Sequence, residues 1–459
     1  MEVEFSAPEY FDDGSFQSAN YRFSGDTEAG WLIERNGLRH LELGPGYRIL
    51  RVESCGVCST DLARQFLPFP LPQITGHEVL ATDETGGRFV VEINASHQAR
   101  GVKSDCPFCS AELHTHCPDR IVLGIHDLPG GFGPWVLAPV NAVLPLPDEI
   151  PSSAGVLVEP LAAALNAVEM VHPTAGETIA VLGPRRLGML VVAALGAYRN
   201  TSSIDFEIMA LARHQSLLDL SREFGATSTR LVDGDGEALP DNLADVVIDT
   251  TGNPEALELA TRLARREVHL KSTHGRSSAG LNHMTELVVD ELRLGPFEDK
   301  ENSDARVAWL ADANPQEGVF AGEAEAVLER LENGAACGDL PRADVAVVDS
   351  AERIEQAIRP SVGHQRSLVK PRGDILLTKA AKASSDALLV HKIVDHGLRL
   401  TSSRCGDFRR AIQLLLEDPE LRKVGEKLVT HAFDNSDMNA TFGTARSSEC
   451  IKAVVQMRW

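Results

Sequence analysis

Apolar and polar positions change their spacing midway along the chain. Between residues 30 and 147, apolar residues alternate with polar ones or form short runs bounded by glycine and proline, as in residues 47–52. This pattern predicts β-strands. From residue 178 onward, short apolar runs such as 178–183 and 244–249 are separated by longer segments that suit helices. Strands that alternate with helices are typical of a parallel sheet. The chain is therefore expected to contain a β-rich part followed by an α/β part.

The first 28 residues are polar and acidic and show no clear period. We expect them to form an N-terminal arm that is only loosely docked. The whole chain has 459 residues, a length that suggests two or three domains.

The formal net charge of -22 argues against nucleic acid and anionic membranes as partners, because both bind basic surfaces. No apolar run reaches the roughly 18 residues of a membrane span, and the N-terminus has no signal-peptide pattern. Eight cysteines are too few for a disulfide scaffold, and three of them are closely spaced. This spacing indicates metal binding in a reducing compartment, so we expect a cytoplasmic protein.

Residue types that bind metals gather in the β-rich part. Cys58 is followed by Asp61, and His77 and Glu78 come after a proline-rich span. Thiolate and imidazole ligands suit zinc, and a catalytic zinc needs only three protein ligands beside water. Cys58 would supply sulfur, His77 nitrogen, and Glu78 or a distant carboxylate the third contact. The alternative is a buried free cysteine near a helix start, with a core histidine further along.

The segments Cys55-Gly-Val-Cys58-Ser-Thr60-Asp61 and Gly76-His77-Glu78 resemble the zinc-dependent medium-chain dehydrogenases, a family of alcohol, polyol, sugar and threonine dehydrogenases. The resemblance implies that Cys58, not Cys55, binds the catalytic zinc, with His77 as the second ligand. It implies Glu78 as a nearby or exchanging ligand and Asp61 as the carboxylate that orients the histidine.

The same resemblance assigns two further roles. Thr60 matches the hydroxyl that relays the substrate proton, whereas Ala63 replaces the histidine that continues this relay in alcohol dehydrogenases. Glu159, which precedes Pro160, matches a glutamate that approaches the catalytic zinc in the polyol and sugar branches. The alternative for Glu159 is an ordinary carboxylate at a helix N-terminus, where the helix dipole favours it.

Cys106, Cys109 and Cys117 have the spacing of a closed structural zinc site, which ordinarily has four ligands. In the related dehydrogenases a fourth cysteine precedes the first of these by three residues, but here that residue is Lys103. The residues just before His97 resemble those that precede the missing cysteine in the family. This likeness would make His97 the fourth ligand. Three residues are rival ligands, namely Asp105, His114 and His116. The alternative is a metal-free lobe with three free thiols.

A strand at residues 178–183 leads into Gly183-Pro-Arg185-Arg186-Leu187-Gly188 and an apolar helix. A strand, a glycine-rich turn and a helix N-terminus together seat a pyrophosphate. The middle glycine of the usual fingerprint is replaced by Arg185, although that glycine normally permits close approach of the backbone to phosphate. Either Arg185 and Arg186 contact the phosphate, or the site is partly blocked.

The strand that ends at Ala212 indicates which nicotinamide cofactor is used. NAD-binding proteins usually carry an acidic residue at this place for the ribose 2'-hydroxyl. Here Arg213 and His214 follow Ala212, and an arginine pairs with a 2'-phosphate. We therefore expect NADP, with NAD as the alternative. Thr250 is expected on the adenosine side of the cofactor, and Lys271 and Ser272 beside the nicotinamide.

The segment after residue 297 weakly repeats the α/β part. Residues 343–349 resemble 244–249, residues 373–379 resemble 267–271, and residues 393–400 resemble 288–294. The copy lacks a phosphate loop, so we expect it to extend the sheet or to build an interface, not to bind a second cofactor. Chance similarity among α/β segments is the alternative.

These observations predict an α/β protein with a GroES-like, β-rich catalytic domain, a doubly wound Rossmann nucleotide-binding domain and an α/β insertion. The predicted ranges are 1–28 for the arm, 29–165 with 401–459 for the catalytic domain, 166–297 for the Rossmann domain and 298–400 for the insertion.

The predicted function is a zinc-dependent oxidoreductase that transfers a hydride between NADP or NAD and a secondary alcohol, polyol, sugar or amino alcohol. Its expected partners are a small-molecule substrate and further copies of itself, because the resemblance implies dimers or tetramers. One alternative is a zinc protein of the same fold with lost or altered nicotinamide use. The other is a non-catalytic interaction protein.

Overall fold

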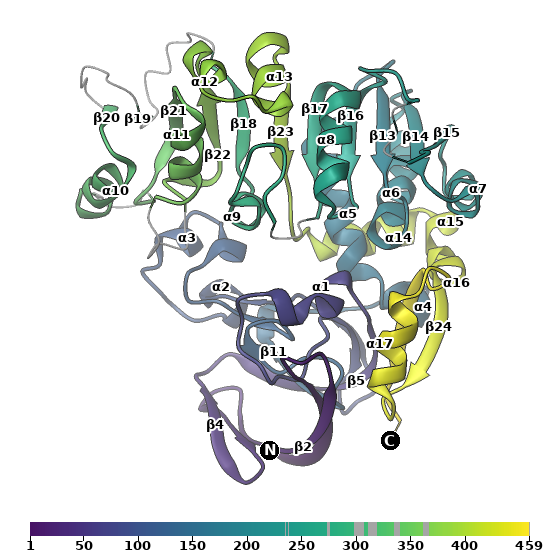
Figure 1. The fold of residues 1–459 in the computed structure, drawn as a ribbon. Coiled ribbons are helices and arrows are strands. Elements are labelled where there is room, and N and C mark those ends of the chain that lie inside the picture. The colour runs from purple at the N-terminus through teal and green to yellow at the C-terminus, as the bar shows by residue number, and fades with distance from the viewer. Residues whose placement is uncertain are drawn as a thin grey trace. The chain divides into compact units, whose positions relative to one another are not determined.

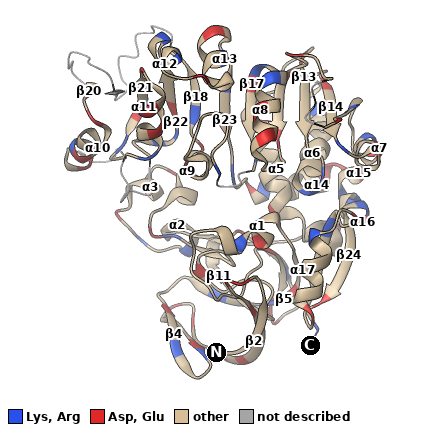
Figure 2. Cartoon of the chain, in the orientation of Figure 1, with Lys and Arg blue, Asp and Glu red and all other residues tan. Residues whose placement is uncertain are grey.

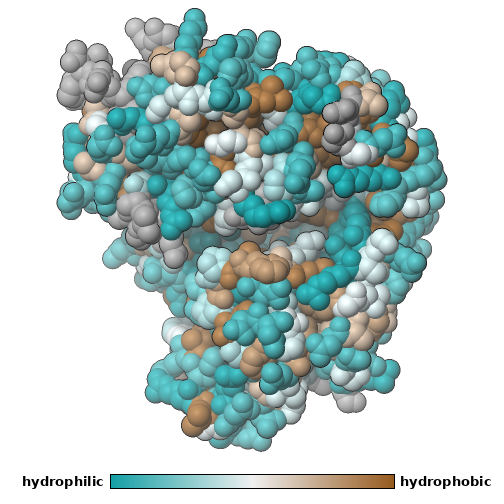
Figure 3. All heavy atoms as spheres, in the orientation of Figure 1, coloured by the Kyte–Doolittle hydropathy of each residue, from teal (hydrophilic) through white to brown (hydrophobic). Residues whose placement is uncertain are grey.

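The computed structural model describes residues 1–234, 236, 238–272, 276–297, 307–310, 319–334, 340–360 and 367–458. The chain divides into two compact units (Figure 1). Unit 1 comprises residues 1–162 and 406–459, and unit 2 comprises residues 163–405. Acidic and basic residues are interspersed along the elements of both units (Figure 2), and the face drawn in Figure 3 is mostly hydrophilic with small apolar patches. Among the described helices, none is both long and apolar enough to cross a bilayer.

Residues 1–28 are not a loose arm, so that expectation is wrong. They form the hairpin β1 (Glu2–Tyr10) and β2 (Phe16–Asp26), which pairs antiparallel and continues into β3 (Gly30–Arg35) and β4 (Leu38–Leu43). In the middle of β2 every second residue is buried, namely Ala19, Tyr21 and Phe23. Gln17 and Gly25 have the same parity but are not apolar, so the sequence shows this period of two over a short stretch only.

The second sheet of unit 1 adjoins the segments of Cys58 and His77 and includes Glu78 as the first residue of β6. Its strand order is β12-β7-β6-β5-β25-β24, with β11 also paired to β5. The last strand of the chain lies antiparallel to β5, with Val455 opposite Cys55. The pairing therefore places the C-terminal strand beside the Cys55–Cys58 stretch. The strands are β5 (Tyr47–Gly56), β6 (Glu78–Thr82), β7 (Arg88–Val91), β11 (Trp135–Pro139), β12 (Val143–Pro145), β24 (Val429–Asp434) and β25 (Lys452–Gln456).

The remaining elements of unit 1 are mostly short. A three-stranded sheet and several single-turn helices form the lobe that contains Cys106, Cys109 and Cys117. All remaining elements of unit 1, inside and outside this lobe, are α1 (Ser59–Leu62), η1 (Arg64–Phe66), β8 (Asn94–Ala95), α2 (His97–Arg100), α3 (Pro107–Ser110), η2 (His114–His116), β9 (Ile121–Leu123), β10 (Asp127–Leu128), η3 (Val140–Ala142), α4 (Ser152–Gly155), α5 (Val158–Val171, which runs into unit 2), α14 (Phe408–Glu417), α15 (Pro419–Arg422), α16 (Val424–Leu428) and α17 (Met438–Arg446).

Unit 2 is built on one sheet, whose first half has the order β15-β14-β13-β16-β17-β23 with every pair parallel. The strand order reverses at β13, and ligands of open α/β sheets bind at such a switch point. The strands are β13 (Thr178–Leu182), β14 (Glu207–Ala212), β15 (Ser228–Leu231), β16 (Ala244–Asp249), β17 (Ala264–Leu270) and β23 (Arg399–Ser402). The helices are α6 (Arg186–Ser202), α7 (Gln215–Glu223), α8 (Pro254–Leu263) and α13 (Leu388–His396).

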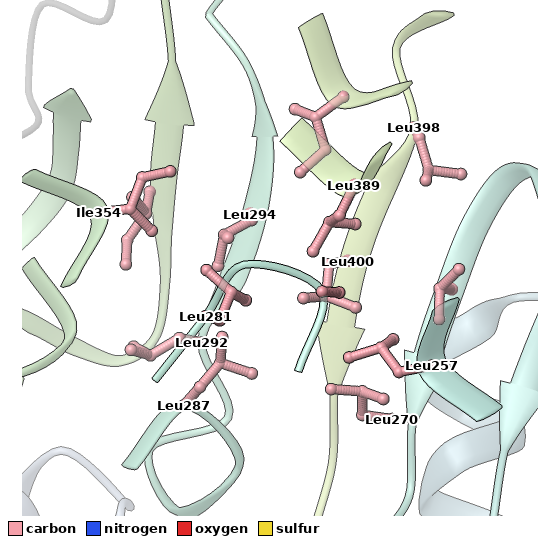
Figure 4. Packing of buried hydrophobic residues seen from close by; sticks show 14 of the residues in the cluster. Leu257, Leu270, Leu281, Leu287, Leu292, Leu294, Ile354, Leu389, Leu398 and Leu400 are labelled. Carbon is pink, nitrogen blue, oxygen red and sulfur yellow. The ribbon is translucent and has the colours of Figure 1, made fainter. Parts of the chain in front are cut away.

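The second half of this sheet continues as β18-β22-β21-β19-β20, and β18 meets β23 antiparallel. A single apolar core runs along both halves, and Figure 4 shows Leu294 and Leu400 within it. The inserted residues therefore extend the sheet, although residues 298–306 at the start of the insertion lie outside the described ranges. The elements are α9 (Met284–Val289), β18 (Arg293–Pro296), β19 (Val307–Leu310), β20 (Val319–Ala321), α10 (Ala324–Asn333), β21 (Ala343–Val348), α11 (Ala351–Ile358), β22 (Val369–Leu377) and α12 (Lys379–Ala383).

Candidate metal and cofactor sites

One buried carboxylate holds the two backbone segments that carry the predicted catalytic ligands. Asp61 is 1% exposed and lies on α1, the short helix that Cys58 precedes with extended backbone. Its side chain accepts hydrogen bonds from the backbone N–H of Cys58 at 2.8 Å and of Gly76 at 3.2 Å. Its Oδ1 also lies 3.4 Å from Nδ1 of His77. Asp61 therefore fixes Cys58 and His77 relative to each other.

Cys58, His77 and Glu78 form a group that we call the Cys58 cluster. Their ligand atoms all lie within 4.8 Å of one another, and His77 and Glu78 are buried. Burial alone would lower the pKa of His77, but the charges of Asp61 and Cys58 outweigh it and hold this pKa well above its usual value. Sulfur, nitrogen and oxygen donors that converge where cationic charge is favoured fit a zinc ion.

Cys55 lies close by but does not belong to this cluster. Its thiol is fully buried and donates weakly to the carbonyl of Gly56 at 3.6 Å. Burial, with the nearby charges of Asp61 and Glu78, raises the pKa of Cys55 well above its usual value. A thiol that resists ionisation is a poor metal ligand, so Cys55 acts in packing.

Lys452 contacts the Cys58 cluster and was missed by the sequence reasoning. This lysine of β25 is 4% exposed, forms an ion pair with the Glu78 carboxylate and donates to the carbonyl of Val57 at 3.1 Å. Gly56 makes room for the pair, because a Cβ there would collide with the Glu78 carboxylate. The available signal was a lysine in the apolar strand that begins at Lys452.

Two other predicted residues lie apart from the Cys58 cluster or at its margin. Thr60 is half-buried, and its hydroxyl lies 3.7 Å from Sγ of Cys58. Glu159 is half-buried in the first turn of α5 and is not a member of the metal-binding groups found among the described residues. The structure thus brings Cys58, His77, Glu78, Asp61 and Thr60 together, and it leaves Glu159 outside the ligand group.

A second group, which we call the His97 cluster, consists of His97, Cys106, Cys109 and Cys117, whose ligand atoms also lie within 4.8 Å of one another. Nδ1 of His97 lies 3.7 Å from Sγ of Cys109 and 3.4 Å from Sγ of Cys117, and the sulfurs of Cys106 and Cys117 are 3.9 Å apart. Zinc bound tetrahedrally by sulfur and nitrogen places its ligand atoms about 3.5–3.8 Å apart. The four residues therefore fit a closed zinc site.

The rival fourth ligands lie elsewhere. His114 faces the Glu92 carboxylate at 3.6 Å, His116 contacts the hydroxyl of Thr115, and Asp105 is exposed. None of the three belongs to the metal-binding groups of the described residues. The Nε2 atom of His97 lies 3.8 Å from the carboxylate of Asp119, which is a typical orienting partner for a ligand histidine.

The predicted phosphate loop connects β13 to α6, at the switch point of the sheet. Gly183 has a φ of +81°, and a Cβ at Gly183 or Gly188 would collide with Thr251 or Thr250. Arg185 in contrast has a φ of -117°, so this position does not need the positive φ that favours glycine. The backbone therefore accepts an arginine at the middle position, and α6 begins at the next residue, Arg186, with Leu187 in its first turn.

The remaining predicted cofactor residues lie at the carboxyl ends of neighbouring strands. Arg213 and His214 are exposed between β14 and α7, and Thr250 donates to the carbonyls of Leu182 and Gly183 at 3.0 and 2.9 Å. The ammonium of Lys271 is buried and donates to oxygens of Ser403 and Arg404, and Ser272 follows half-buried. Lys271 therefore ties the ends of β17 and β23 together.

The family and relatives of the chain agree with this geometry. Residues 44–148 match the family model of the alcohol dehydrogenase GroES-like domain. The chain is 30% identical over 238 residues to the L-galactonate-5-dehydrogenase of Escherichia coli K12, covering 48% of this chain and 67% of that protein. It is 27% identical over 201 residues to an L-threonine 3-dehydrogenase of Mesorhizobium japonicum, covering 40% of this chain and 57% of that protein.

Solved structures share the fold. A zinc-binding dehydrogenase of Sinorhizobium meliloti 1021, bound to NADP, superposes with a TM-score of 0.57 at 17% identity over 99% of both chains. The L-idonate 5-dehydrogenase of Escherichia coli gives a TM-score of 0.55 at 13% identity, again over 99% of both chains. At these identities the likeness shows the fold alone.

Proposed function

The chain belongs to the zinc-dependent medium-chain dehydrogenase family, whose members are zinc- and NAD(P)-linked oxidoreductases, and we propose that it oxidises a secondary alcohol with NADP. The expected family and the expected combination of GroES-like and Rossmann folds are confirmed. The substrate class that we propose is a polyol, sugar or amino alcohol. The single observation that carries the proposal is the Cys58 cluster, in which buried sulfur, nitrogen and oxygen donors converge and Asp61 fixes two of them.

The proposed reaction converts the alcohol and NADP⁺ into a ketone, NADPH and a proton. When bound, zinc lowers the pKa of the substrate hydroxyl as a Lewis acid, and NADP accepts the hydride. Cys58 and His77 would hold the ion, and Asp61 keeps the His77 ring oriented. Thr60, whose hydroxyl lies beside Cys58, would accept the proton of the substrate oxygen while passing its own proton on to water. Lys452 holds the Glu78 carboxylate by an ion pair, which suits a ligand that exchanges.

Zinc analysis combined with turnover measurements tests this function. The purified protein would be assayed with polyols, sugars, hydroxy acids and amino alcohols, with NADP and NAD in parallel. We expect NADPH formation and zinc in the protein. Zinc without binding of either nicotinamide would instead support a zinc protein that has lost nicotinamide use, with Arg185 as the motivating change. The absence of zinc would favour a non-catalytic interaction protein.

The preference for NADP is supported by the end of β14. Residues 212–216 at the end of this strand include no carboxylate, and Arg213 is exposed there, where it can pair with a 2'-phosphate. Arg213→Ala should therefore weaken NADPH binding far more than NADH binding in a fluorescence titration. Arg222→Ala is a matched control, because Arg222 is exposed on the following helix and pairs with Asp219 at 2.9 Å. Equal losses for both cofactors would contradict the NADP assignment.

The His97 cluster supports a second, structural zinc. Three sulfurs and one imidazole nitrogen fill a tetrahedron, so no position remains for substrate. Such an ion contributes folding energy to the lobe around it.

Two further proposals concern location and assembly. The cysteines of both clusters are free, and free metal-binding thiols suit a reducing compartment, so we propose the cytoplasm. The expected homo-oligomer stays a proposal, and it would have to form through a surface that the chain does not already cover.

A further inference from the structure

Two segments of unit 2 resemble each other in sequence, and we call them the two copies. Residues 287–294 read Leu-Val-Val-Asp-Glu-Leu-Arg-Leu, and residues 393–400 read Ile-Val-Asp-His-Gly-Leu-Arg-Leu. Each segment contains the end of a helix and the start of the strand that follows it, namely α9 with β18 and α13 with β23. The segments therefore occupy equivalent places in the repeat that the sequence indicates.

Each copy pairs with the half of the sheet that it does not directly follow in the chain, so the two copies are exchanged between the halves. The strand β18 follows β17 in the chain but pairs with β22, whereas β23 follows β22 and pairs with β17. The register is the same in both pairs, because Arg293 lies opposite Asp374 and Arg399 lies opposite Glu267.

The exchanged strands meet each other in an antiparallel pair. Its bridge joins Leu294 to Leu400, which are the same position in the two copies (Figure 4). A contact between equivalent residues across an antiparallel junction is the mark of a two-fold interface between identical subunits. Here both sides of the interface come from one chain.

Buried polar groups determine which copy pairs with β17. His269 on β17 is fully buried, and its two ring nitrogens lie 2.8 Å from the hydroxyl of Thr401 and 2.9 Å from that of Ser403. The hydroxyl of Thr401 also donates to the Glu267 carboxylate at 2.5 Å.

The copy on β18 offers none of these partners, since Gly295 and Phe297 replace Thr401 and Ser403. On β22, the residue that faces Gly295 is the apolar Leu376. Without the exchange, the buried histidine would lose both hydroxyl partners, which is unfavourable for any buried polar group.

Charges on the two helices select the same arrangement. Lys392 of α13 donates to Asn242 at 2.8 Å and to the carbonyls of Arg262 and Ala264 at 2.9 and 3.2 Å, all in the first half of the sheet. The equivalent residue of α9 is Glu286, which pairs with Arg359 of the second half at 3.4 Å. In the unexchanged arrangement this carboxylate would face carbonyl oxygens at the end of α8, which repel it.

We propose that the second half of the sheet, which the inserted residues build, takes the place that a second copy of the chain would otherwise occupy at the junction of β18 and β23. The polar groups of β17 and β23 and the charges of α9 and α13 enforce the exchange. The edge of β23 is consequently filled by the chain itself and is closed to a partner subunit.

Hydrogen exchange of the intact protein at several concentrations tests the closed edge. The amides of residues 293–295 and 399–402 should keep the same protection on strong dilution, because an intramolecular pair does not depend on concentration. Protection that falls on dilution would show that another chain supplies the pairing strand, and it would overturn the proposal. This readout is independent of zinc, of turnover and of any oligomer formed through another surface.

Substitutions on the two copies test the part played by the polar groups. Thr401→Val removes the hydroxyl that His269 and Glu267 share, so we expect a lower Tm and faster exchange in β17 and β23. The matched control is Gly295→Ala, at the equivalent position of β18, where a new Cβ would lie 3.8 Å from Leu376 and adds no polar group. We expect little change in this control. Unchanged exchange in Thr401→Val, or an equal loss in both variants, would overturn the assigned role.

Discussion

The two ligand clusters of unit 1 differ in how completely they surround an ion. The His97 cluster has four donors, three of them sulfur, on the short elements around α2, α3 and η2. The Cys58 cluster has three donors of three kinds, beside the strands β5, β6 and β25. A zinc with four protein ligands stabilises structure, whereas one with three keeps a position for substrate. In the proposed assignment, the number of ligands separates a stabilising site from a reacting site within one unit.

Removal of the sulfur ligand from the Cys58 cluster should have the largest effect. Lewis-acid stabilisation is worth several kcal/mol, and each 1.36 kcal/mol is tenfold in rate. Cys58→Ser should therefore lower turnover roughly 10³-fold, with little change in Tm. Steady-state kinetics and circular dichroism would measure both quantities. Cys405→Ser, which changes a half-buried cysteine of unit 2, is the control. Full activity in Cys58→Ser would contradict the assignment of the reacting site.

Substitution in the His97 cluster should produce the opposite pattern. His97→Ala removes one ligand, so zinc content should fall from about two ions per chain to about one, and the Tm should fall with it. His97→Cys restores four ligands and should keep both the metal and the stability. Metal analysis and calorimetry would report the outcome. Equal zinc content in wild type and His97→Ala would exclude His97 as a ligand.

Asp61→Asn should weaken the Cys58 cluster without removing a ligand. Partners that orient a ligand histidine typically contribute about 10–100-fold in metal affinity or activity, and Asp61 also holds the Cys58 and Gly76 amides. We expect a loss in this range for the catalytic zinc in a chelator competition, with the structural zinc retained. An equal loss of both ions would indicate general unfolding instead of an orienting role.

Of these substitutions, Lys452→Met should have the smallest effect on zinc affinity, and it tests whether the Cys58 cluster keeps an open position. The Glu78 carboxylate would lose its ion-pair partner, so we expect it to bind the ion more permanently and to close the open position. Zinc affinity should then rise a few-fold while turnover falls. The change also leaves a buried carboxylate without its counter-ion, and loss of one partner of a buried pair costs about 3–5 kcal/mol. Lower zinc affinity together with normal turnover would contradict this role of Lys452.

Much of the reacting site was predictable because its parts are local in the chain. Cys58, Thr60 and Asp61 lie within one turn of helix, and His77 and Glu78 are adjacent. The residue types alone suggested zinc, and the resemblance to the family assigned the roles. The phosphate loop and the strand before it were predictable for the same reason. The period of two in residues 16–26 was present but short, because only Ala19, Tyr21 and Phe23 carry it.

The sequence by itself determined the family and the fold class and predicted the residues that would bind zinc and cofactor, because these depend on short motifs and on the period of apolar positions. Only the tertiary structure decided which distant groups meet. It placed Lys452 beside Glu78, selected His97 over its rivals, and exchanged β18 with β23 between two nearly equivalent partners. The physical reason is that strand pairing and burial join residues hundreds of positions apart, and hydrogen bonds made between buried groups choose among pairings that look alike locally.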